Sequence, residues 1–149
     1  MAPPEHDPAL EYCLIVDIDG TLARMHDRGH FDWDKVGQDD IHHDIKQLVN
    51  QIDIGNFGRR VHMILCSGCD EVCRPQTEAW LVKHGVYYTE LHMRPEGNLE
   101  KDTILKERIY RDHIQGRYNV LYALDDHNQV VDMWCNLSLR CLQVADGDF

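Results

Sequence analysis

Short, nearly continuous apolar runs alternate along this chain with longer stretches in which apolar residues are spaced. Residues 14–16, 61–66 and 120–124 are apolar runs rich in β-branched side chains, and such runs predict strands that are buried on both faces. A short extended segment is predicted over residues 86–93, and a last strand over residues 141–144. The pattern therefore indicates a sheet whose two faces are both covered.

Between these strands, apolar residues recur at intervals of three and four, which predicts amphipathic helices. The predicted helices span residues 41–52 after a cap at Asp39 or Asp40, a segment opened by Pro75, residues 99–114 after a cap at Asn98, and residues 130–137. Because strands and helices alternate, the sequence predicts an α/β fold of three layers with a mostly parallel central sheet.

Two segments show neither a continuous apolar run nor a helical spacing of apolar residues. Residues 22–37 are irregular and highly charged, with Phe31 and Trp33 among them, and we expect a flap over the strand ends. Residues 1–10 contain three prolines and are expected to form a disordered leader, so that 11–149 make one domain. No apolar run approaches the roughly 20 residues of a membrane span, and the first residues lack the features of a signal peptide, so we expect a cytoplasmic protein with no membrane contact.

The charge balance limits the kinds of partner. Fifteen Lys and Arg oppose 26 Asp and Glu, a formal net charge of −11. Proteins that hold nucleic acid through many phosphate contacts need a basic surface. We therefore expect no extended nucleic-acid binding surface, and contact with no more than an end of such a polymer.

The first predicted strand ends in Asp17-Ile18-Asp19-Gly20-Thr21. If the strand continues through this segment, alternation along extended backbone directs Asp17 and Asp19 to the same side. Two carboxylates held close together favour a divalent cation with oxygen ligands. The alternative is a surface turn, because Asp and Gly are common in turns. Parallel sheets bind ligands at the carboxyl ends of their strands. That edge is expected to gather Asp17, Asp19, Thr21, Ser67 and Asp125.

The chain has six cysteines, and three of them invite a metal interpretation. Cys66, Cys69 and Cys73 have a spacing similar to that of zinc ligands, but no second Cys-x-x-Cys pair follows. Cys13, Cys66 and Cys141 lie in or beside apolar runs, where a thiol acts as a small core residue. We favour reduced cysteines over structural zinc.

From residue 12 onward the chain resembles the haloacid dehalogenase superfamily of phosphohydrolases. The superfamily's four motifs are matched in order by Asp17-x-Asp19-Gly20-Thr21, Ser67-Gly68, Lys101 and Asp125-Asp126. A narrower resemblance is to the 3′-phosphatase domain of phage polynucleotide kinase-phosphatases. It is carried by Asp27-Arg28-Gly29, Arg94, Lys101-Asp102, the segment 124–134 and the ending 141–149. The short segment between the first two motifs implies a small flap in place of a full cap domain.

The resemblance implies a role for each matched residue. Asp17 is the expected nucleophile that forms an aspartyl-phosphate, and Asp19 the expected general acid and base. Mg²⁺ is expected on Asp17, the backbone carbonyl of Asp19 and Asp125, with Asp126 close by. The residues expected to contact the substrate phosphate are Thr21, Arg28, Ser67, Gly68 and Lys101.

Some of these assignments have alternatives. Lys101 begins a predicted helix, where a lysine is usually solvated, and one of Asp125 and Asp126 could cap the helix that follows. The chain departs from the phage pattern at Cys69, where the phage domain has arginine, and Arg74 is a candidate for supplying the missing positive charge.

The sequence thus predicts a Mg²⁺-dependent phosphomonoesterase that removes 3′-phosphates from nucleic-acid ends or nucleotides during repair. The alternatives are a phosphatase of free nucleotides or small metabolites, and a catalytically silent binding module. A homo-oligomer and a separate kinase or ligase are the possible partners.

Overall fold

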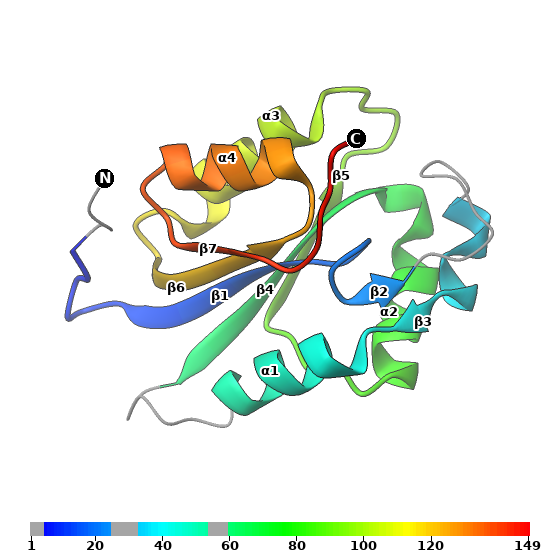
Figure 1. Cartoon of the computed structure of the whole chain (residues 1–149), viewed down its shortest axis with the longest axis horizontal. Coiled ribbons are helices and arrows are strands. Elements are labelled where there is room, and N and C mark those ends of the chain that lie inside the picture. The colour runs from blue at the N-terminus through cyan, green and yellow to red at the C-terminus, as the bar shows by residue number, and fades with distance from the viewer. Residues whose placement is uncertain (1–4, 25–32, 54–59) are drawn as a thin grey trace.

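Five strands form one parallel sheet through the middle of the molecule, in the order β5-β4-β1-β6-β7 (Figure 1). The computed structural model describes residues 5–24, 33–53 and 60–149. Every neighbouring pair of strands runs parallel. In chain order the strands are β1 (Glu11–Asp17), β4 (Val61–Asp70), β5 (Glu90–Arg94), β6 (Tyr118–Asp125) and β7 (Cys141–Gln143).

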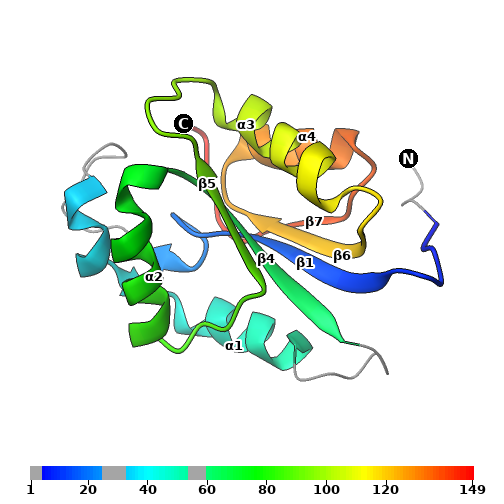
Figure 2. The ribbon, with the colours of Figure 1, turned by 180° about the vertical axis from the view of Figure 1, so that it is seen from behind.

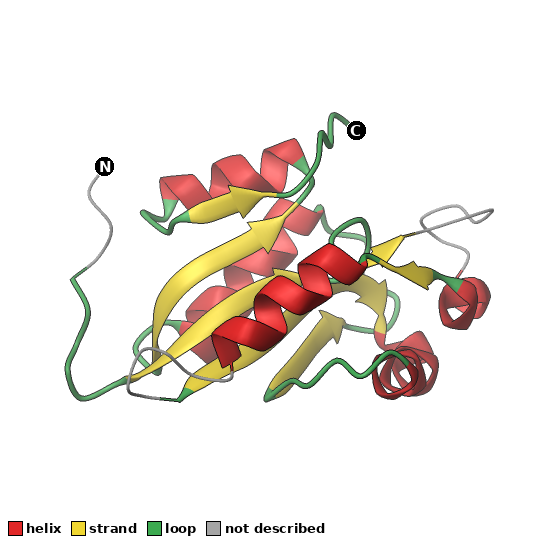
Figure 3. Ribbon diagram, turned by 60° about the horizontal axis from the view of Figure 1, so that its bottom comes forward, coloured by secondary structure: helices red, strands yellow, loops and turns green. Residues whose placement is uncertain are grey.

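Helices cover both faces of this sheet, as the view from behind in Figure 2 and the tilted view in Figure 3 also show. One face carries α1 (His43–Asp53) and α2 (Arg74–Lys83), and the other carries α3 (Asp102–Ile109) and α4 (Asn128–Asn136). A short π-helix, Tyr110–Ile114, continues α3. The three-layer α/β fold with a parallel sheet predicted from the sequence is confirmed.

The middle strand β1 explains why the apolar runs are continuous. Leu14 and Val16 belong to a core cluster with the helices α1 and α2, whereas Cys13 and Ile15 belong to a second cluster with α3 and α4. All four side chains are at most 1% exposed. Because successive residues of a strand face opposite sides, a strand with a core on each side must be apolar at every position.

The helix boundaries differ from the predicted ones by a few residues, and two of the differences have a visible cause. Asp40–Ile41 forms a short strand, β3, which pairs with β2 (Ala23–Arg24), and α1 therefore begins only at His43. The helix predicted from residue 99 begins at Asp102. The side chain of Asn98 does not cap it, because its Oδ1 accepts hydrogen bonds from Arg94 and from the backbone N–H of Glu100.

The flap and the leader are described only in part. Of the flap region, the structure describes residues 22–24 and a 3-10 helix, Trp33–Gln38; Arg28 lies outside the described residues. A second 3-10 helix, Glu71–Cys73, precedes α2. In the leader, Asn119 donates hydrogen bonds to the carbonyls of Asp7 and Leu10, so these residues are anchored to β6. Within the described residues, no helix combines the length and the apolar character of a membrane span.

Candidate active site

Three aspartates meet where two neighbouring strands end. Asp17 is the last residue of β1, Asp125 is the last residue of β6, and Asp126 follows it. These two strands are paired, with Val16 opposite Leu124, so their ends lie at the same edge of the sheet. One carboxylate oxygen from each aspartate lies within 4.8 Å of the others, and all three side chains are buried. The expected convergence of Asp17 and Asp125 is therefore present.

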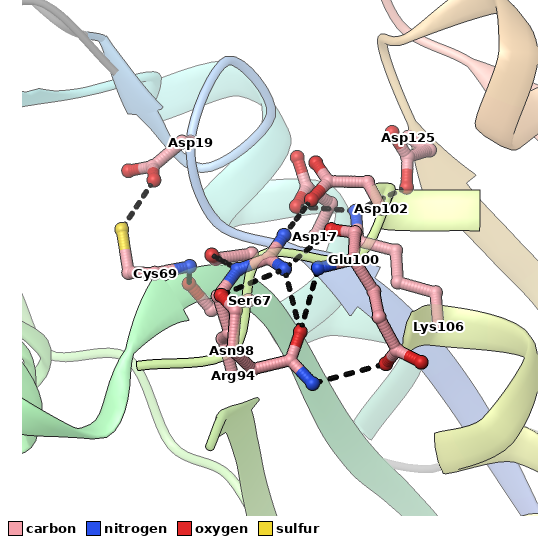
Figure 4. Close-up of polar contacts among 11 residues, drawn as sticks. Asp17, Asp19, Ser67, Cys69, Arg94, Asn98, Glu100, Asp102, Lys106 and Asp125 are labelled. Atoms are coloured by element: carbon pink, nitrogen blue, oxygen red, sulfur yellow. Dashed lines mark hydrogen bonds and ion pairs between the residues drawn. The ribbon is translucent and has the colours of Figure 1, made fainter. Parts of the chain in front are cut away.

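A buried lysine from α3 bridges two of these carboxylates (Figure 4). The Nζ atom of Lys106 lies 2.8 Å from Oδ1 of Asp17 and 2.8 Å from Oδ2 of Asp125. Only 3% of the Lys106 side chain is exposed. Asp125 has a further bond, because its Oδ1 accepts the backbone N–H of His127 just before α4.

Burial and the charge of neighbouring carboxylates raise the pKa of Asp17 and Asp126. The pKa of Asp17 is raised by burial and by the carboxylates of Asp125 and Asp126, against the lowering effect of Lys106. Burial and the charge of Asp125 likewise raise the pKa of Asp126. Burial alone would lower the pKa of Lys106, but Asp125 and Asp17 raise it well above its ordinary value, so the ammonium stays charged. The site thus holds a fixed positive charge among acids that repel one another.

The donor set fits a hard divalent cation. Three carboxylates and one ammonium carry a formal charge of −2, which one divalent ion balances. Carboxylate oxygens are the ligands that Mg²⁺ prefers, and it typically takes a few of them together with water. The grouped oxygens come from Asp17, Asp125 and Asp126. These residues can therefore hold Mg²⁺, and the cost of gathering three acids in a buried place is the physical reason to expect it.

The turn after β1 depends on Gly20. Gly20 has a φ of +85°, and a Cβ there would lie 2.2 Å from a carboxylate oxygen of Asp126. Thr21, which follows, is completely buried, and its Oγ1 lies 3.2 Å from Oδ2 of Asp17, to which it donates. The motif therefore orients Asp17 and lets Asp126 approach the backbone. Thr21 was expected to contact substrate phosphate, but its hydroxyl is already bonded to Asp17.

Asp19 points in a different direction from Asp17. Figure 4 shows its side chain turned toward Cys69, and its Oδ2 lies 2.7 Å from the Sγ atom of that residue. The side chain of Ser67, in turn, accepts the backbone N–H of Cys69 at 3.1 Å. The carboxylate of Asp19 thus stands apart from the three grouped acids. This separation is consistent with different tasks for the two motif aspartates.

The cysteines do not converge on a metal site. Cys66 packs in the core cluster beside α3 and α4, whereas Cys69 and Cys73 pack in the cluster on the opposite face. Burial raises the pKa of the Cys66 thiol to about 12. None of the six cysteines, all within the described residues, forms a disulfide.

Arg94 links three segments that line the site. Its guanidinium donates to the carbonyls of Gly68 (2.8 Å) and Glu100 (2.6 Å) and pairs with the carboxylate of Asp102. The same carboxylate lies so close to Gly68 that a Cβ there would be 2.9 Å from it. Arg94 therefore joins the ends of β4 and β5 to the start of α3, the helix that carries Lys106.

A cavity of about 560 Å³ opens over these residues. Its walls include all the acids discussed above, Lys106 of α3, and Lys101, the residue just before α3. The lining residues are Asp17, Asp19, Gly68, Cys69, Arg94, Asn98, Leu99, Glu100, Lys101, Asp102, Lys106, Asp125, Asp126, His127 and Phe149. A volume of this size is typical of a small-molecule site.

Two assignments from the sequence change. The lysine that balances charge beside the acids is Lys106, whereas Lys101 is exposed at the cavity wall, five residues earlier. Arg74 was a candidate to replace the arginine missing at Cys69, but it pairs with Glu71 and Glu78 and is absent from the described cavity lining. The sequence did contain a signal for Lys106. It is next to Leu105 and three residues before Ile109, two core residues of the same helix, and this spacing places Lys106 on the buried side of that helix.

Comparisons with known proteins identify the family. The family model of the polynucleotide kinase PNKP phosphatase domain matches residues 11–149. A putative bifunctional polynucleotide kinase/RNA ligase of Autographa californica nuclear polyhedrosis virus is 32% identical over 128 residues, which are 85% of this chain and 18% of that protein.

Two solved structures have closely similar chains. One belongs to a Pnkp1/Rnl/Hen1 complex (TM-score 0.90) and the other to a Pnkp1/Rnl/Hen1 RNA repair complex (TM-score 0.92), each at 35% identity. The matches cover 98% and 99% of this chain, and 50% and 47% of theirs. The chain thus spans about half of each structural neighbour and less than a fifth of the viral relative. With its fold, its acidic site and a family match over nearly its whole length, the chain belongs to the family of polynucleotide kinase PNKP phosphatase domains.

Proposed function

We propose that this phosphatase domain removes 3′-phosphates from nucleic-acid ends with the help of Mg²⁺. The observation that carries the proposal is the buried group of Asp17, Asp125 and Asp126 with Lys106 between two of them, at the floor of an open cavity. The family match supports phosphate ester hydrolysis, and the relatives named for polynucleotide kinase and RNA repair support a nucleic-acid substrate.

Asp17 is the nucleophile of the proposed reaction. A carboxylate oxygen of Asp17 attacks phosphorus, the bond between phosphorus and the ester oxygen breaks, and its electron pair stays on the departing 3′-oxygen. The bonds from Lys106 and Thr21 hold this carboxylate in one orientation before substrate arrives. A fixed orientation matters because in-line attack tolerates little angular error. The product of this step is an aspartyl-phosphate.

Asp19 handles the protons. Its carboxylic acid gives a proton to the departing 3′-oxygen, which leaves as a hydroxyl. The resulting carboxylate then takes a proton from water, and the water oxygen attacks phosphorus and releases inorganic phosphate from Asp17. The position of the Asp19 carboxylate, apart from the grouped acids and in contact with Cys69, supports a task for it other than holding the cation.

The proposed Mg²⁺ ligands are Asp17, Asp125 and Asp126, with the backbone carbonyl of Asp19. The chemistry that Mg²⁺ supplies when bound is neutralisation of charge on the phosphoryl oxygens. Lys106 adds a fixed positive charge of the protein's own at the same place. The remaining proposed phosphate contacts are Ser67, the backbone N–H of Gly68, Lys101 and, outside the described residues, Arg28.

The charge of the chain favours recognition of an end over recognition of a duplex. At a net charge of −11, few phosphates along a polymer can be neutralised. The cavity instead admits a terminal group to buried reacting residues. We further propose that a kinase and a ligase act with this domain, since the relatives carry those activities or assemblies in their names.

A substrate comparison tests the proposed function. Purified protein with Mg²⁺ is given an oligonucleotide with a 3′-phosphate, the same oligonucleotide with a 5′-phosphate, a nucleoside 3′-monophosphate and glycerol phosphate. We expect kcat/KM to be highest for the 3′-phosphorylated oligonucleotide, and Asp17→Asn to abolish turnover. A higher kcat/KM for glycerol phosphate or the free nucleotide would contradict end repair and favour a phosphatase of small molecules. Absence of turnover with every substrate would favour a silent binding module.

A further inference from the structure

An exposed aromatic ring lines the cavity whose floor holds the grouped acids. Phe149 is 59% exposed, and it lines that cavity together with Asp17, Asp19 and Lys106. Figure 1 shows the last residues of the chain running up beside the loop between β5 and α3. Leu99, in that loop, is 89% exposed and lines the same cavity. The cavity thus combines an acidic floor with large apolar side chains that remain in contact with solvent.

The ring of Phe149 is held in place by His127. The two rings are stacked, with centroids 4.4 Å apart and planes inclined by 12°. The Nε2 atom of His127 also lies 2.6 Å from the backbone oxygen of Phe149. His127 in turn follows Asp125 and Asp126 directly, and its backbone N–H is bonded to Asp125. The position of the aromatic ring is therefore tied to the same strand end that supplies two of the acids.

The cations of the cavity leave little charge for binding a polymer. Among the described lining residues, the positively charged side chains are Arg94, Lys101 and Lys106. Arg94 is bonded to Gly68, Glu100 and Asp102, and Lys106 is bonded to Asp17 and Asp125. With three cations among the described lining residues, and two of them already bonded to the protein, an acidic protein gains from another source of affinity for a nucleic-acid end. Stacking of a base on an aromatic ring provides one that does not depend on charge.

We propose that Phe149, supported by His127, is a stacking platform for the base of the terminal nucleotide. This inference rests on the proposed function, because it requires a nucleotide whose 3′-phosphate lies over Asp17. Stacking is tolerant of sequence, since every base has an aromatic face. Phe149 thus gives affinity for nucleotides over alkyl phosphates without selecting one base.

The test combines one protein variant with one substrate change. The substrates are a 3′-phosphorylated oligonucleotide and the same oligonucleotide with an abasic terminal nucleotide. For Phe149→Ala we expect KM to rise about tenfold with the intact substrate, equal to about 1.4 kcal/mol, and to stay unchanged with the abasic one. Phe149→Trp should keep the wild-type KM. Tyr87→Ala is the matched control, because Tyr87 is 72% exposed and lies outside the described cavity lining.

A second measurement reports binding without turnover. In an Asp17→Asn background, an oligonucleotide with fluorescent 2-aminopurine as its terminal base should lose fluorescence on binding, and Phe149→Ala should abolish that loss. Equal effects of Phe149→Ala on intact and abasic substrates, or no effect on either, would overturn the stacking role while 3′-phosphate hydrolysis continued. Failure of the wild type to hydrolyse 3′-phosphorylated ends would overturn the proposed function and this inference with it.

Discussion

The ammonium of Lys106 lies 2.8 Å from the carboxylate of Asp17, although 89 positions separate the two residues in the chain. The same ammonium contacts Asp125, so α3 is tied to the ends of both β1 and β6. The contact joins the helix on one side of the sheet to the proposed nucleophile. We therefore expect the loss of Lys106 to reduce activity and stability more than the loss of Lys101.

Replacing Lys106 by methionine should lower kcat at least a hundredfold, because a fixed charge beside the reacting group is lost. The change should also lower the free energy of unfolding by about 3–5 kcal/mol, since buried acids lose their partner. The control is Lys101→Met, at an exposed position, which should leave folding intact and change mainly KM. Steady-state kinetics and urea unfolding measure both effects. Equal losses of kcat in the two variants would contradict a specific contribution of the Lys106 charge to catalysis.

This pair of lysines also marks the limit of what the sequence could predict. The strands were predictable because a core on each side demands continuous apolar runs, and the acids because they follow those runs directly. Lys106 was missed because helical spacing places a residue on a face of the helix without stating what that face meets. Lys101 was preferred because it precedes the helix in the order of the family motifs.

Arg74 was misjudged for a related reason. It lies only five residues after Cys69, and closeness in sequence suggested that it could replace a cation there. The helix that it begins carries its side chain toward Glu71, Glu78 and the carbonyl of Leu91 instead. Glu71 and Glu78 lie at the spacings of three and four residues at which helical side chains meet, so these two pairs had a local signal in the sequence. The bond to the Leu91 carbonyl depends on tertiary packing instead.

Mg²⁺ should stabilise the protein in the absence of substrate. A ligand at 100 times its Kd stabilises the native state by about 2.7 kcal/mol, which for a domain of this size corresponds to a rise in Tm of about 5–10 °C. EDTA should abolish both the rise and the activity. Asp126→Asn should remove most of the rise yet increase Tm without metal, because it relieves repulsion among the grouped acids.

The control for that experiment is Asp146→Asn, at an exposed position, which should leave the Mg²⁺ response unchanged. Thermal melts with and without Mg²⁺ give all the values needed. A Tm that does not respond to Mg²⁺ in the wild type would contradict the assignment of the three aspartates as cation ligands.

Arg94→Lys should weaken the site while keeping the charge. A lysine cannot reach the Gly68 and Glu100 carbonyls and the Asp102 carboxylate together, because it lacks the planar fork of the guanidinium. We expect the free energy of unfolding to fall by about 1–3 kcal/mol, since buried acceptors are left unpaired. The start of α3 would also move, so kcat should fall too. Arg140→Lys, at an exposed position, is the control and should behave as the wild type.

Glu90 should make the protein sensitive to acid. Burial raises the pKa of Glu90, but hydrogen bonds from Tyr118 and His92, together with the charge of Arg117, have a larger lowering effect. The pKa of Glu90 in the folded protein is therefore below its ordinary value of 4.5. The Oε2 atom of Glu90 lies 2.6 Å from the Tyr118 hydroxyl, which donates to it. A carboxyl group whose pKa is lower in the folded state stabilises that state above its unfolded pKa. This stabilisation is lost as the pH falls below about 4.5 and through the folded pKa.

Glu90→Gln should therefore be less stable than the wild type at pH 7, and the difference should shrink toward pH 3. Urea unfolding at several pH values gives the free energies to compare. The control is Glu96→Gln, at an exposed position, for which we expect a small difference at every pH. If the difference in free energy of unfolding between Glu90→Gln and the wild type stays constant from pH 7 to pH 3, the charge of Glu90 does not contribute to stability. The effect of the substitution would then come only from altered hydrogen bonds.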